Sequence, residues 1–119
     1  MVSLFRYPKR RLKKLISEGE YVEAIKLGNS LESKFSDDPD FMFIMGGVYF
    51  ILEDPKIALP YFEKAVQLDN NDVETLKLKT DVHLDLQQKD EAIHCCKQIL
   101  KLEPKNYQAQ DLLDELENL

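Results

Sequence analysis

Residues 41–66 of the chain have the sequence FMFIMGGVYFILEDPKIALPYFEKAV. The first twelve of these residues form an apolar run that carries no charge. Asp54 followed by Pro55 then indicates a new helix start, because the aspartate can cap free backbone N–H groups and a proline at the first helical position loses no hydrogen bond. Apolar side chains follow at helical spacing: Ala58, Phe62, Ala65 and Val66. The stretch therefore predicts two helices joined by a short turn.

The same pattern occurs three times along the chain. Ala24, Ala58 and Ala92 recur at one constant interval without any insertion, and we call this interval the repeat period. A fixed period is typical of repeat proteins, in which a unit that cannot bury its own apolar face stacks on its neighbours. Residues 105–119 begin a fourth copy and stop halfway. This last segment carries leucines on one face and acids on the other, as expected for a helix that caps a stack.

A helix–turn–helix unit with a period of about 34 residues resembles the tetratricopeptide repeat (TPR). The third copy matches the family pattern less well than the middle copy, and the first copy is degenerate, with Gly28 at a position where the pattern has phenylalanine. The middle copy carries the pattern at six positions: Met42, Met45, Gly46, Tyr49, Ala58 and Phe62.

The resemblance implies an all-α fold, an α-solenoid of three TPR-like helix-turn-helix units plus a C-terminal capping helix. Seven helices would then form a right-handed superhelix. We expect residues 1–119 to form a single TPR domain, with units at approximately 5–38, 39–72 and 73–106 and the capping helix at 107–119.

Small residues predict where the helices approach one another closely. Gly28 lies in the middle of a predicted helix, where glycine costs about 1 kcal/mol relative to alanine, and we interpret it as a close helix contact. Gly46 has the same interpretation. Within the apolar run, five residues are predicted to face the stack: Met42, Met45, Gly46, Tyr49 and Leu52.

In the TPR family, the first helices of the units line a concave groove that binds peptides or partner helices. Four residues of the apolar run are left to face this groove, and Gly47 would leave a notch between the aromatic rings of Phe43 and Phe50. An exposed apolar patch of this kind indicates a binding site. The alternatives are that these side chains bury one another, or that the segment with Leu4 and Phe5 covers them. The predicted groove comprises Lys9, Lys13, Asp40, Phe43, Gly47, Phe50, Ile51, Lys77, Asp81, Leu84 and Asp85.

Charge differs between the two ends of the predicted groove. Lys9 and Lys13 make one end basic, whereas Glu74, Asp81 and Asp85 make the other end acidic. Opposite charges at the two ends can orient a ligand, although an ordinary solvated surface would explain each charge equally well.

Some TPR domains clamp the C-terminal carboxylate of heat-shock chaperones with lysine, asparagine and arginine. Only Lys9 agrees cleanly with that clamp, and Glu74 would repel a carboxylate. We therefore expect no chaperone-tail binding of this type. The matching positions are Lys9, Lys13, Ile44, Glu74 and Leu78.

The overall composition excludes several classes of protein. The 119 residues carry a formal net charge of −6, so we expect no nucleic acid partner. The apolar run of twelve residues is shorter than the roughly 20 that span a membrane, and the two cysteines do not indicate a disulfide scaffold. Because the sequence given contains no targeting segment, we expect a cytoplasmic protein.

The basic run from Lys9 to Lys14 leaves a second interpretation open. It could tether the chain to anionic lipid, although a first helix with a solvated basic face explains it equally simply and is favoured. A third interpretation is self-association into a homo-oligomer that buries Phe43 and Phe50.

Nothing in the sequence indicates an enzyme. His94, Cys95 and Cys96 are adjacent on a predicted helix and point in different directions, so they do not have metal-ligand spacing. We expect Cys96 to be buried, Cys95 to be more exposed and His83 to be a packing residue. No cofactor and no metal are expected. The sequence thus predicts a non-catalytic protein-interaction module, such as an adaptor, co-chaperone or assembly factor.

Overall fold

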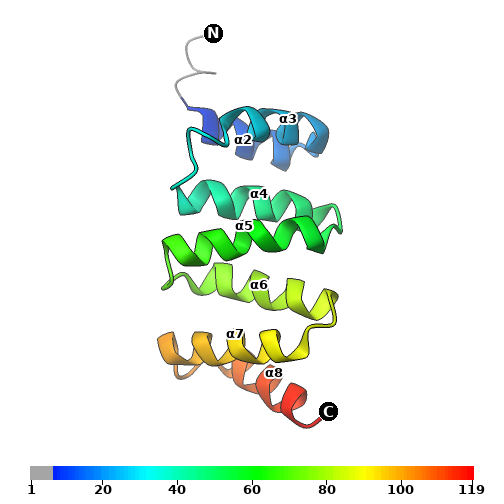
Figure 1. Cartoon of the computed structure of the whole chain (residues 1–119), viewed down its shortest axis with the longest axis vertical. Helices are drawn as coiled ribbons and strands as arrows, with labels where there is room; N and C mark the ends of the chain where they lie inside the picture. The colour runs from blue at the N-terminus through cyan, green and yellow to red at the C-terminus, as the bar shows by residue number, and fades with distance from the viewer. Residues whose placement is uncertain (1–6) are drawn as a thin grey trace.

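The computed structural model describes residues 7–119, which form an elongated stack of helices 54 Å long (Figure 1). Within that range the chain has seven helices and no strand. The expected all-α solenoid is therefore confirmed, whereas Leu4, Phe5 and Arg6 lie outside the described residues. The helices are α2 (Pro8–Ser17), α3 (Tyr21–Leu31), α4 (Pro39–Ile51), α5 (Pro55–Leu68), α6 (Val73–Asp85), α7 (Lys89–Leu102) and α8 (Tyr107–Glu117).

Consecutive helices pack against each other along the whole stack. Three antiparallel pairs, α2–α3, α4–α5 and α6–α7, are followed by α8, which packs on α7 (Figure 1). The pairs join one another through contacts of α3 with α4 and of α5 with α6. Each pair thereby buries its apolar surface against the next, as expected of a solenoid.

Side-chain caps fix the start of four helices. Asp54 accepts a hydrogen bond from the Ile57 N–H, and Asp72 caps α6 in the same way. The cap at Asp54 was predicted from the sequence, as was Pro55 at the start of α5. Asp38 accepts from two backbone N–H groups of α4, and Asn106 accepts from one of α8. These bonds satisfy N–H groups that a helix start leaves free.

The turn within each helix pair has the same geometry in all three pairs. Gly19, Glu53 and Gln87 are separated by the repeat period, and each has a positive φ, of 76°, 59° and 59° respectively. The N–H of the following residue donates to a carbonyl five residues back, at 2.8–2.9 Å in each case. This is the left-handed helix ending that favours glycine. The periodicity of the sequence therefore extends to the backbone of the turns.

Small residues lie where helices are closest. Ala24, Ala58 and Ala92 are each completely buried. A Cβ on Gly28 would overlap the Met45 side chain, and a Cβ on Gly46 would lie 2.7 Å from the Phe62 ring. The predicted close contacts at both glycines are confirmed, and they hold α3 against α4 and α4 against α5.

The repeated turn yields a stability prediction. Glu53→Gly and Gln87→Gly should each raise the free energy of unfolding by about 0.5–1 kcal/mol. The left-handed conformation costs a non-glycine residue roughly 1–2 kcal/mol, which glycine avoids. The greater conformational entropy of glycine in the unfolded state cancels part of this gain. Urea unfolding followed by circular dichroism measures the change. Gly19→Ala at the equivalent turn is the matched control and should be destabilising; glycine variants less stable than the parent would contradict the prediction.

Candidate functional site

The eleven residues of the predicted groove lie on the first helix of each pair. Two are on α2, five on α4 and four on α6. The structure separates them into a charged group where α2 meets α4, an apolar group on α4 and a mixed group on α6.

The lysines of α2 are paired with Asp38, the N-cap of α4, and with Asp40 in its first turn. Lys9 Nζ lies 2.7 Å from Asp38 Oδ2 and 3.4 Å from Asp40 Oδ2, and Lys13 Nζ lies 3.5 Å from Asp40 Oδ2. Partial burial would raise the pKa of Asp38, but the hydrogen bond and charge of Lys9, together with the backbone N–H groups of Phe41 and Asp40, outweigh it and lower that pKa. The same hydrogen bond raises the pKa of Lys9. The two positive charges at this end are thus offset by two negative ones, and the pairs link α2 to the start of α4.

The apolar group on α4 is partly packed and partly open. Phe43 meets Phe62 edge-on with ring centroids 6.2 Å apart, and Phe43 and Phe50 are both half-buried against a cluster that contains Phe62. Ile51 is 49% exposed. A Cβ on Gly47 would have no atom within 4 Å. The structure therefore places open space above Gly47, which we call the notch.

One stack-facing prediction on this helix is wrong. Leu52 was expected to face the stack, but it is 43% exposed. It is the C-terminal cap of α4, after Ile51, and its N–H already bonds the carbonyl of Val48. The helix ends at Ile51, one residue before Leu52, and the chain then leaves the stack. The helical spacing that predicted burial of Leu52 therefore does not extend to it.

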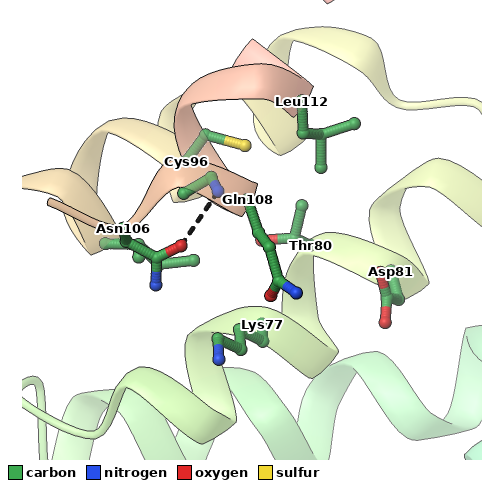
Figure 2. A pocket seen from close by; sticks show the side chains of 9 residues that line it. Lys77, Thr80, Asp81, Cys96, Asn106, Gln108 and Leu112 are labelled. Carbon is green, nitrogen blue, oxygen red and sulfur yellow. Dashed lines mark hydrogen bonds between the residues drawn. The ribbon is translucent and has the colours of Figure 1, made fainter. Parts of the chain in front are cut away.

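A cavity of about 190 Å³ lies between α6, α7 and α8 (Figure 2). Lys77 and Asp81 on its α6 side belong to the predicted groove. The α8 residues were not predicted, although Gln108 lies one repeat period after Glu74, and that spacing could have revealed them. We call this space the α6–α8 cavity; its lining residues are Lys77, Thr80, Asp81, Cys96, Ile99, Asn106, Gln108, Ala109 and Leu112.

The remaining groove residues of α6 differ in their surroundings. Leu84 is half-buried and packs against the α7–α8 cluster that contains Cys96 and Leu113, so it contributes to the core. Asp81 and Asp85 are exposed and form no ion pair with any residue of 7–119. Burial of the Asp81 carboxyl and the charge of Asp85 both raise the pKa of Asp81.

The cysteines are less accessible than the sequence suggested. Cys95 and Cys96 are 1% and 0% exposed, so the expectation that Cys95 is more exposed is wrong. The reason is that α7 is covered on two sides: Cys95 lies near Thr80 of α6, whereas Cys96 packs against Leu113 of α8. Burial raises the pKa of both thiols. His83 is also buried, and its Nδ1 lies 2.8 Å from Gln88 Oε1.

Residues 7–119 contain no group of three or more His, Cys, Asp or Glu side chains that could hold a metal ion. None of the helices described there has the length and apolar character needed to cross a membrane.

Comparison with known proteins gives a family and a fold. A family model described as tetratricopeptide repeat matches residues 49–116. The first TPR of Spaghetti (RPAP3), bound to the HSP90 peptide SRMEEVD, has a TM-score of 0.80 and 24% identity over 92% of this chain and 87% of that one. The MamA protein has a TM-score of 0.86 and 17% identity, and the match covers 99% of this chain and 64% of that one. The Yersinia enterocolitica type III secretion chaperone SycD, in complex with a peptide of the translocator YopD, has a TM-score of 0.83 and 13% identity. That match covers 98% of this chain and 94% of the other. No curated protein matches the sequence.

Two adjacent glycines of α4 allow a matched test of the packing. Gly46→Ala should lower the free energy of unfolding by about 1–3 kcal/mol, because its Cβ would crowd the Phe62 ring. Gly47→Ala should instead raise it by about 0.5–1 kcal/mol, because the new methyl group enters open space and alanine favours a helix. Denaturant unfolding measures both changes in the free energy of unfolding. If both variants lost the same stability, the notch would be filled by other atoms.

Thiol reactivity tests the buried position of the cysteines. In the native protein at pH 8, neither Cys95 nor Cys96 should react with a coloured disulfide reagent within minutes, since the thiolate is the reactive form and burial opposes it. Both should react at once in urea above the unfolding midpoint. A Val22→Cys variant adds an exposed thiol as positive control. Rapid native reaction of Cys95 would contradict the structure.

Proposed function

Because this chain belongs to the tetratricopeptide repeat family, we propose that it is a non-catalytic module that binds a segment of a partner protein on the face formed by the first helices of its pairs. The role would be that of an adaptor, co-chaperone or assembly factor. The notch at Gly47 is the observation that supports the proposal most directly. It is open space on a helix that carries no charge from residue 41 to residue 52.

The helix α4 has more apolar surface than the stack needs. Six of its residues are buried: Phe41, Met42, Ile44, Met45, Gly46 and Val48. Phe43 and Phe50 remain half-exposed on either side of Gly47, and Ile51 is largely exposed. A surface helix normally keeps a polar face toward water. An apolar side chain of a partner would fit between the two rings, as the anchor residues of interfaces do.

Structural neighbours bind peptides, but the residues of this chain do not match those needed to bind an acidic chaperone tail. The RPAP3 domain is bound to an acidic HSP90 peptide, and SycD to a peptide of YopD. Here Ile44 is buried and Leu78 is half-buried at positions where the chaperone clamp needs polar groups, and Glu74 is an exposed acid. Lys13 is engaged with Asp40. We therefore propose a partner other than a chaperone tail.

A matched pair of substitutions at one residue tests the proposal. Gly47→Trp should fill the notch and abolish capture of specific partners from a lysate, read by mass spectrometry. Gly47→Ala adds only a methyl group and should leave capture intact. Aspartate at Phe43 is a poorer choice because Phe43 packs on Phe62, whereas nothing lies within 4 Å of the Gly47 Cβ position.

Circular dichroism establishes that both variants are folded. If Gly47→Trp retains the same captured proteins as the parent, the proposed surface is wrong. Light scattering over a concentration series addresses self-association through the same surface. A parent that is oligomeric and a Gly47→Trp variant that is monomeric would assign the notch to a second copy of the chain instead.

A further inference from the structure

We infer that the α6–α8 cavity receives one aliphatic side chain of a basic peptide segment, so that the ligand of this chain is opposite in charge to the HSP90 peptide of its structural neighbour. This inference rests on the proposed function.

The walls and volume of the cavity suit a single apolar side chain. Cys96, Ile99, Thr80 and Ala109 line it and are all buried. The Thr80 hydroxyl donates to the Leu76 carbonyl at 2.7 Å, so the polar group of that wall is already satisfied. At about 190 Å³, the cavity is smaller than the roughly 300–1,000 Å³ of sites for drug-sized ligands.

Polar groups at the mouth can hold the backbone of a peptide. The Gln108 side chain extends from α8 toward Lys77 of α6, across the opening (Figure 2). Gln108 is exposed, and its amide makes no hydrogen bond with any residue of the described range 7–119. A free amide offers both a donor and an acceptor, which is what an extended peptide backbone requires. The side-chain oxygen Oδ1 of Asn106, in contrast, accepts the Ala109 N–H and so caps α8.

The two helices α6 and α8, which form two walls of the cavity, carry more acidic residues than lysines. Lys77 is the cation of the cavity wall. The acids of α6 on the groove side are all exposed, and α8 places two more exposed acids one repeat period after Lys77 and Asp81. The ion pairs of residues 7–119 involve none of them. The five acids are Glu74, Asp81, Asp85, Asp111 and Glu115.

Such a field selects the charge of the ligand. Complementary charge steers association and rejects partners of the same sign. The HSP90 peptide SRMEEVD contains three acidic residues and would be repelled at this end. A segment with lysine or arginine beside its aliphatic residue would be attracted.

A random peptide library identifies the ligand chemistry without assuming a partner. Phage displaying short random peptides are selected on the full chain, and the most enriched peptide is measured by fluorescence anisotropy. We expect a leucine, isoleucine or methionine flanked by lysine or arginine. Asp81→Lys should weaken binding about tenfold and reduce its dependence on salt. Glu91→Lys makes the same charge change on α7, away from the cavity lining, and should have little effect.

A second variant tests the cavity itself. Gln108→Trp places a bulky ring at the mouth from an exposed position, so it should leave the fold intact by circular dichroism and weaken binding at least tenfold. Acidic selected peptides, or binding unchanged by Gln108→Trp, would overturn the inference. So would a library from which no peptide is enriched. The proposed function is tested separately, by capture with Gly47→Trp, so its failure can be distinguished from failure of this inference.

Discussion

The close approach of neighbouring helices at small residues determines the geometry of the whole stack. Gly28 leaves room for Met45, and Gly46 leaves room for Phe62, so that α4 is held by the helix before it and the helix after it. A methyl group at either glycine would force one of these larger side chains to move, and packed interiors accommodate such changes poorly. The position of α4, and with it the direction in which the notch opens, follows from these two contacts.

Stability and recognition are carried by different residues of the same helices. On α4, Gly46 is covered by an aromatic ring, whereas its neighbour Gly47 is covered by nothing within 4 Å. On α8, Leu113 and Leu116 pack on α7, whereas Gln108 extends over the α6–α8 cavity. Because a helix turns about 100° per residue, adjacent positions face different surroundings. The exposed positions can therefore change with little cost to the stack.

Much of the fold could be predicted from the sequence, because it depends on local patterns that repeat. The spacing of the alanines, the cap at Asp54 and the small residue at Gly46 are local signals, and the structure confirms them. The site was harder to predict because its contacts are distant in sequence. Lys9 of the first helix pair meets Asp38 at the start of the second. Cys95 is buried because a second helix covers it, which its own helix does not reveal.

The capping helix shows why a repeat should be followed past its last complete copy. Its acidic outer residues were interpreted as a solvated face, and that interpretation overlooked the side of α8 that faces α6. The repeat period places Gln108 in register with Asp40 and Glu74, and the structure puts it in the wall of a cavity with Lys77. A helix that closes the stack thus also completes a recess beside α6. From position 106 to 119 the chain carries acids and no basic residue, which is the physical basis for the basic ligand proposed.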